Sequence, residues 1–307
     1  MIDKLYRTNN LTRNELIDLI NENRHQVNEK LLKAAVLTRD KHYGHEVINR
    51  ALIEFTNYCK NDCFYCGIRK SNKNACRYRL TKEEILDTCQ EGYKLGFGTF
   101  VLQGGEDCFY TDDIMVDLIK TIKGKYPDWA LTLSFGEKSY DTYKKYYDAG
   151  ADRYLLRHET ATDKHYKKLH PSNMSLEIRK KALYDLKEIG FQVGAGFMVE
   201  SPYQTTENLA DDLLFLKELE PDMVGLGPFI PHKDTMFAKE KHGSLEMTLL
   251  MLALVRLLLP KVLLPATTAL ETIDQKGRDK GYLAGANVVM INISPVQAKE
   301  NYSLYDR

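Results

Sequence analysis

The sequence lacks an excess of charge, a long apolar run and a secretion signal. Lysine plus arginine and aspartate plus glutamate both number 43, so a net charge of zero gives no reason to expect nucleic acid as a partner. The longest apolar stretch, 245–260, contains Glu246 and Arg256 and is too short to cross a membrane, which predicts a buried helix. Without a signal peptide, the six cysteines are expected to be reduced thiols of a cytoplasmic protein rather than a disulfide framework.

The sequence also lacks a fourth ligand for its one group of closely spaced cysteines. Cys59, Cys63 and Cys66 follow the apolar run 51–56 in the spacing CxxxCxxC. An electron-carrying iron–sulfur protein or a structural zinc site usually closes its metal with four protein ligands. Three thiolates leave one metal position open, and an open position is where a substrate or cofactor coordinates.

Two alternatives compete with an open metal site on these cysteines. The three thiols could form a zinc knuckle that borrows His42 or His45, or they could be unconnected core residues, since single cysteines often act as small buried hydrophobes. The remaining cysteines have no mutual spacing typical of metal ligands. We therefore expect Cys76, Cys89 and Cys108 to be structural.

Strands and helices alternate from Arg50 to the end of the chain. The expected strands are mostly apolar throughout, as strands buried on both faces are. They are 51–55, 99–103, 130–135, 153–157, 192–199, 223–227, 262–266 and 287–291. Eight parallel strands over roughly 250 residues, each followed by a helix, predict an α/β fold, a (β/α)8 barrel of the TIM type. Only a short tail follows the last strand, so we expect an irregular segment to close the barrel.

The first 48 residues predict short helices. Thr12 and Glu15 form a capping box, and Thr81 and Glu84 form a second one that opens the helix after the cysteine loop. No linker or low-complexity segment interrupts the chain. We therefore expect a helical N-terminal extension, 1–48, that covers the bottom or side of one catalytic barrel, 49–307.

A barrel of this type places its chemistry at the carboxyl ends of its strands, and polar residues concentrate there in this sequence. Arg157 and Glu159 alternate with His158, so in an extended backbone they share a face. They could recognise a zwitterion or a ribose, or they could form an internal salt bridge. His158 points the other way and is expected to be packed or hydrogen-bonded. Arg179 could add a second positive charge or lie in solvent.

Hydroxyl groups follow the seventh expected strand and recur in the tail. Thr267 and Thr268 suit a carboxylate or another anionic ligand, at a position where barrel enzymes commonly hold anions. Alternatively, the two threonines stand there only because threonine favours strands. Tyr302 and Tyr305 could form a lid over the mouth of the barrel or could simply pack.

The cysteine spacing, with Tyr65 before the last cysteine, resembles the signature of the radical S-adenosylmethionine (SAM) enzymes. Gly104-Gly105-Glu106 resembles the GGE element of the same superfamily, whose glycines let the backbone approach SAM. Longer stretches, among them GADRYLLRHET and GPFIPH, resemble the HydE family of FeFe-hydrogenase maturases, and this resemblance runs from Ile53 to Tyr305.

The resemblance implies a SAM-dependent radical enzyme in the assembly of the hydrogenase active-site cluster. Its substrate would be a small iron–carbonyl–cyanide complex that carries cysteine, and its cofactors would be SAM and one 4Fe-4S cluster. Carried over by matching position, the cluster ligands would be Cys59, Cys63 and Cys66. The SAM pocket would contain Gln103, Gly104, Ser134, Glu159, Arg179, Met198 and Tyr302. The substrate would contact Arg157, Thr267 and Thr268, with Tyr305 at the mouth.

The implied partners are a reductant protein such as a ferredoxin or flavodoxin, and other hydrogenase maturases. Two departures from the family pattern stand out: the tail has no cysteines, which predicts no second cluster, and Gly104 stands where some relatives have serine. Three alternatives remain open. They are a radical SAM mutase of the methylornithine synthase type, a sulfur-inserting enzyme of the biotin synthase type, and a non-catalytic metal-binding scaffold.

Overall fold

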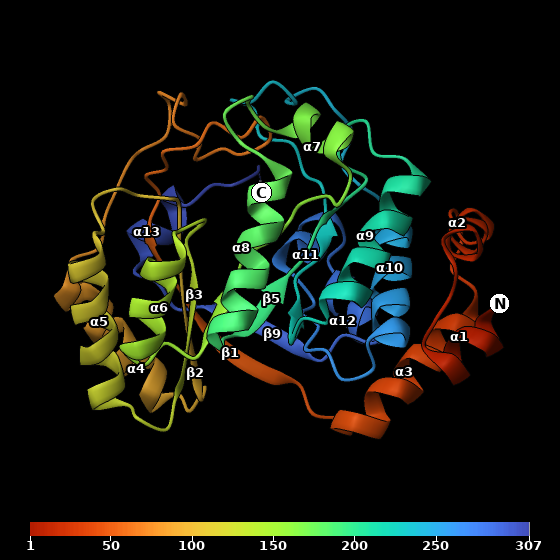
Figure 1. Cartoon of the computed structure of the whole chain (residues 1–307), viewed down its shortest axis with the longest axis horizontal. Coiled ribbons are helices and arrows are strands. Elements are labelled where there is room, and N and C mark those ends of the chain that lie inside the picture. The colour runs from red at the N-terminus through yellow and green to blue at the C-terminus, as the bar shows by residue number, and fades with distance from the viewer. Residues whose placement is uncertain (307) are drawn as a thin grey trace.

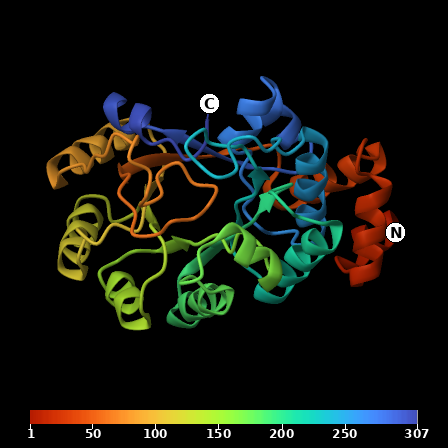
Figure 2. The same ribbon diagram turned by 90° about the horizontal axis from the view of Figure 1, so that it is seen from above.

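A ring of helices surrounds a curled sheet in the computed structural model, which describes residues 1–306 (Figures 1 and 2). The strands are β1 (Ile48–Thr56), β2 (Thr99–Gly104), β3 (Ala130–Ser134), β4 (Arg153–Leu155), β5 (Gln192–Ala195), β6 (Met198–Val199), β7 (Met223–Val224), β8 (Gly227–Pro228) and β9 (Val288–Asn292). The helices after β1 are α4 (Lys82–Lys94), α5 (Asp112–Lys125), α6 (Tyr140–Asp148), α7 (Asp163–Leu169), α8 (Leu176–Ile189), α9 (Thr206–Leu219), α10 (Leu245–Leu258), α11 (Thr268–Ile273), α12 (Gly277–Tyr282) and α13 (Val296–Asn301).

The main sheet is parallel and has the order β7-β5-β4-β3-β2-β1-β9. It confirms the expected α/β barrel, with seven strands in the sheet. The seventh expected strand, 262–266, forms only isolated parallel bridges, from Leu263 to Met223 of β7 and from Pro265 to Val288 of β9. These bridges place it between the two edge strands, so the ring is completed at this position by isolated bridges rather than by a full strand.

Two expected strands are each divided in the structure. The segment 192–199 splits into β5 and β6, and 223–227 splits into β7 and β8, with β6 and β8 paired in a separate two-stranded sheet. The divisions fall at Gly196 and Gly225, where a Cβ on Gly196 would lie 1.9 Å from the Gly225 carbonyl oxygen. This close backbone approach bends both segments, which explains why one continuous strand was the wrong expectation for each.

The N-terminal helices α1 (Ile2–Thr8), α2 (Arg13–Glu22) and α3 (Glu29–Tyr43) lie outside the ring, at the right of Figure 2. Helix α3 packs against α10, and α2 packs against α9. Both predicted capping boxes are present, at the starts of α2 and α4. Helix α10 is buried on nearly all sides, as expected. Within residues 1–306, no helix is both long and apolar enough to cross a membrane.

Candidate active site

The cysteine loop follows β1 and lies over the carboxyl ends of the strands (orange in Figure 2). Cys59, Cys63 and Cys66 are half-buried, form no disulfide, and line one cavity of about 370 Å³. Burial and the neighbouring thiols raise the pKa of Cys63 well above its ordinary value, and burial raises the pKa of Cys66 to about 12. Because a metal binds thiolates, loading this loop would release protons.

The cavity presents the three thiols without a histidine beside them among the described residues. Within residues 1–306, no three His, Cys, Asp or Glu side chains converge as one metal ion requires. Zinc–sulfur bonds of about 2.3 Å would hold tetrahedral thiolates about 3.8 Å apart. An iron–sulfur cluster instead binds each thiolate through a different iron atom, so its ligands stand further apart. His42 and His45 do not line the cavity, which also disfavours the zinc alternative.

Arg77 holds both ends of the cysteine loop together. Its guanidinium donates to four backbone carbonyls, those of Asn57 (2.5 Å), Ile68 (2.8 Å), Arg69 (2.6 Å) and Asn72 (3.2 Å). The loop has no regular secondary structure that could fix its shape. This side chain therefore supplies part of the hydrogen bonding that a helix or strand would have provided.

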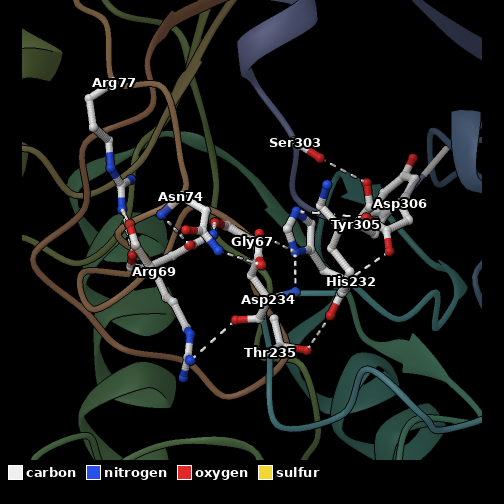
Figure 3. A network of polar contacts seen from close by, with 12 residues as sticks. Gly67, Arg69, Asn74, Arg77, His232, Asp234, Thr235, Ser303, Tyr305 and Asp306 are labelled. Carbon is white, nitrogen blue, oxygen red and sulfur yellow. Dashed lines mark hydrogen bonds and ion pairs between the residues drawn. The ribbon is translucent and has the colours of Figure 1, made fainter.

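The C-terminal tail and the segment after β8 hold the loop from the other side (Figure 3). The Gly67 amide donates to the Leu304 carbonyl at 2.9 Å, and a Cβ on Gly67 would lie 2.3 Å from the His232 ring. Asp306 accepts from the backbone amide of Lys233 at 2.8 Å. Three segments that are distant in sequence therefore meet directly behind Cys66.

The end of β2 lies against the cysteine loop. A Cβ on Gly105 would lie 2.2 Å from the Tyr58 carbonyl oxygen and 2.9 Å from the Cys59 Cβ. Glu106 is buried and lies 3.1 Å from the Lys60 ammonium. Glycine at 105 thus permits an approach that no other residue would allow, consistent with its place in the GGE element.

Arg157 and Glu159 follow β4 and face each other across 3.0 Å, which is the internal ion pair expected as an alternative. The Nη2 and Oε2 atoms form this ion pair, whereas the Arg157 Nε atom is buried without a hydrogen bond in the protein. His158 is fully buried, and its Nε2 atom lies 3.3 Å from the Asp212 carboxylate, so the expectation of a packed histidine is confirmed. The ion pair keeps hydrogen-bonding capacity that a ligand in the cavity could use.

Arg179 is buried rather than solvated. It donates to the Glu137 carboxylate and, at 2.7 Å, to the Arg157 carbonyl oxygen. Its charge is therefore shared with an acid of the protein while its side chain fixes the backbone beside Arg157.

Every other predicted site residue lines the same cavity. They are Gln103, Gly104, Ser134, Met198, Thr267, Thr268, Tyr302 and Tyr305. The Tyr302 hydroxyl shares a hydrogen bond with the Gln103 side chain, and the Thr267 hydroxyl is buried without a partner. Tyr302 is almost fully buried, so it forms part of the cavity wall. The geometry thus brings all predicted site residues together.

Some cavity residues were not predicted. Glu54 is a buried acid in β1 that lines the cavity and accepts from the Asn292 amide at 2.7 Å. A charged residue inside an otherwise apolar strand was the available signal.

Of the cysteines outside the triad, Cys89 is buried in α4, whereas Cys76 and Cys108 are exposed and thus not core residues.

Comparison with known proteins agrees with this fold and site. Residues 53–216, more than half of the chain, match the family model of the radical SAM superfamily. The crystal structure of methylornithine synthase superposes with a TM-score of 0.84 at 30% identity, covering 94% of this chain and 84% of that one. The hydrogenase maturase HydG superposes with a TM-score of 0.79 at 21% identity, covering 99% of this chain and 74% of that one. The fold and the site therefore define a radical SAM enzyme.

Sequence comparison narrows the class further. HydE, the FeFe hydrogenase maturase subunit of Thermotoga maritima, is 48% identical over 305 residues, which cover 99% of this chain and 86% of the relative. The 3-methylornithine synthase of Methanosarcina acetivorans is 33% identical over 282 residues, which cover 91% of this chain and 79% of the relative. This chain belongs to the HydE family of the radical SAM superfamily.

Proposed function

We propose that this enzyme matures the active site of FeFe hydrogenase, with one 4Fe-4S cluster on Cys59, Cys63 and Cys66 and SAM bound beside it. The observation that carries the proposal is that the three thiols and all the other predicted site residues line one cavity. When bound, the cluster and SAM supply a 5′-deoxyadenosyl radical. The tasks of the protein are then binding, orientation and exclusion of water.

SAM carries an amino group, a carboxylate, a ribose and an adenine, and the cavity offers groups suited to each. The proposed SAM residues are Gln103, Gly104, Ser134, Glu159, Arg179, Met198 and Tyr302. Glu159 can accept from ribose hydroxyls, and Arg179 can attract the carboxylate. The close approach at Gly105 supports this assignment, because it places the β2 edge directly beside the cysteine loop.

The substrate of this proposal is a small iron–carbonyl–cyanide complex with a cysteine ligand. Its proposed contacts are Arg157, Thr267 and Thr268, with Tyr305 at the mouth. The unpartnered Nε of Arg157 and the unpartnered hydroxyl of Thr267 support an anionic ligand, because a buried polar atom without a partner is costly. A ligand that restores those hydrogen bonds regains that free energy.

The proposal also includes partners and an organisation of the chain. A reductant protein such as a ferredoxin or flavodoxin would deliver the electron, and other hydrogenase maturases would exchange intermediates with the enzyme. Residues 49–307 would form the catalytic barrel, and residues 1–48 would cover its side.

The test is anaerobic reduction of the reconstituted enzyme with SAM and a synthetic iron–cyanide–carbonyl–cysteine complex. We expect an adenosylated product with the iron complex, and 5′-deoxyadenosine when the complex is left out. We expect neither from Cys63→Ser, which removes one proposed cluster ligand. Reconstitution that yields one zinc without sulfide would reject the enzyme and favour the metal-binding scaffold.

A second candidate is a mutase of the methylornithine synthase type. It is supported by the 33% identity to one such enzyme and by the TM-score of 0.84 to another. The higher identity to HydE, at 48%, favours the maturase. Rearrangement of a free amino acid by the reconstituted enzyme, without reaction of the iron complex, would reverse this preference.

A further inference from the structure

Positive charge is concentrated on the segment that carries the cysteine triad. Between residues 59 and 79, Asp62 is the only acidic residue. The basic residues of the segment are Lys60, Arg69, Lys70, Lys73, Arg77 and Arg79. The whole chain has no net charge, so this accumulation is local.

Ion pairing divides these cations into two groups. Lys60 lies 3.1 Å from Glu106, and Arg79 lies 2.6 Å from Asp107, so both have acidic partners. Within residues 1–306, the other four form no ion pair. We call these four residues, Arg69, Lys70, Lys73 and Arg77, the basic collar. Lys70 and Lys73 are exposed, and Arg69 and Arg77 are half-buried.

The basic collar is held in a defined shape. The Arg69 guanidinium donates to the Asp234 carbonyl at 3.2 Å, and the Asn74 amide donates to the Asp234 carboxylate at 2.8 Å (Figure 3). The Asn72 amide donates to the Gly67 carbonyl at 2.7 Å. A loop fixed in this way presents its lysines without the entropy cost of ordering a flexible segment.

The position of the basic collar suggests its role. It begins three residues after Cys66, and Ile68 lines the cavity with the cysteines. One side of this loop therefore faces the proposed cluster, and Lys70 and Lys73 face solvent. An electron that enters here would cross only the thickness of the loop.

From these observations we infer that the basic collar is the docking surface for a small, acidic one-electron carrier protein. The inference rests on the proposed function, because reductive cleavage of SAM consumes one electron. The carrier loses this electron and is oxidised by one equivalent, and the enzyme gains it. Complementary charge mainly raises the association rate of such encounters and makes it sensitive to salt.

The probe for the test is flavodoxin in its fully reduced form, added to the reconstituted holoenzyme. Lys70→Glu/Lys73→Glu reverses two exposed charges outside the cavity. The matched control is Lys33→Glu/Lys41→Glu, which makes the same charge change at exposed positions of α3. Photoreduced 5-deazariboflavin serves as a small uncharged reductant that needs no docking surface.

We expect the collar variant to lose about tenfold in flavodoxin affinity by calorimetry and in the rate of reduction by stopped-flow absorbance. Raising the salt concentration from about 50 to about 500 mM should lower the flavodoxin affinity and the reduction rate of the wild type by a similar factor. The α3 variant should match the wild type, and all three proteins should be reduced equally by deazaflavin.

Equal flavodoxin affinity and rate in the collar variant and the wild type would overturn the inference. So would salt-sensitive binding of an RNA oligonucleotide in place of flavodoxin. Absence of 5′-deoxyadenosine from the wild type with deazaflavin would instead refute the proposed function. The two failures are therefore distinguishable.

Discussion

Replacing Gly105 with alanine tests whether the backbone contact between β2 and the cysteine loop sets the geometry of the site. The added Cβ would lie 2.2 Å from the Tyr58 carbonyl oxygen, about 1.2 Å short of ordinary contact, which begins at 3.4 Å. Its nearest atoms are backbone and the Cys59 Cβ, so no flexible side-chain end can move away. The loop or the strand must therefore shift.

Two magnitudes follow from this shift. Overpacking of this kind costs about 1–3 kcal/mol of stability. A displacement of about 1 Å at a reacting centre costs about a hundredfold in rate. We therefore expect Gly105→Ala to form 5′-deoxyadenosine about a hundredfold more slowly than the wild type, at equal cluster content measured by iron and sulfide analysis.

Gly124→Ala is the matched control. Gly124 lies in α5, and a Cβ there would meet nothing within 4 Å. Alanine in a helix should stabilise the protein by about 0.5–1 kcal/mol and leave the rate unchanged. If Gly105→Ala cleaves SAM at the wild-type rate with a full cluster, the contact does not set the geometry and the reasoning fails.

Three further predictions concern the cavity wall and its supports. Thr267→Val removes a buried hydroxyl that has no partner in the protein. The midpoint of thermal unfolding should therefore change little, while the affinity for the iron complex should fall about tenfold. An unchanged affinity would place the substrate elsewhere. Burial lowers the pKa of His170 to about 3 from its ordinary 6.5. As the pH falls, the imidazole of His170 is therefore protonated in the unfolded chain before it is protonated in the folded protein. The free energy of unfolding, measured by urea denaturation, should fall as the pH drops below 6.5, by up to about 1.4 kcal/mol per pH unit from this group. If a His170→Gln variant showed the same dependence of the free energy of unfolding on pH, this prediction would be contradicted. Asp107→Asn removes the charge that Arg79 pairs with and should lower the free energy of unfolding, measured in urea, by about 2 kcal/mol. An unchanged midpoint of urea unfolding would show that the ion pair adds no stability.

Features encoded by short stretches of sequence could be predicted. The triad is local, because three thiols within eight residues must face a common space. The apolar strands revealed the barrel, and the barrel placed Arg157 and Thr267 at the same end as Cys59. Both capping boxes were recognisable, since each depends on residues three positions apart.

Features that depend on distant contacts could not be predicted. The four carbonyls that Arg77 binds have no signature, because any backbone can supply a carbonyl. The division of 192–199 arises from Gly196 lying against Gly225, and the sequence does not say that these two glycines meet. The burial of Arg179 similarly depends on Glu137 lying beside it.

The contact between the cysteine loop and the tail has a consequence for biosynthesis. The Asn57 amide donates to the Asn301 carbonyl at 2.8 Å, and the Gly67 amide donates to the Leu304 carbonyl at 2.9 Å. Both loop residues are translated more than 230 residues before their partners. A nascent chain on the ribosome therefore exposes its three thiols without their final support. Iron delivered before residues 301–304 have been translated and have folded back would meet a loop that lacks this support.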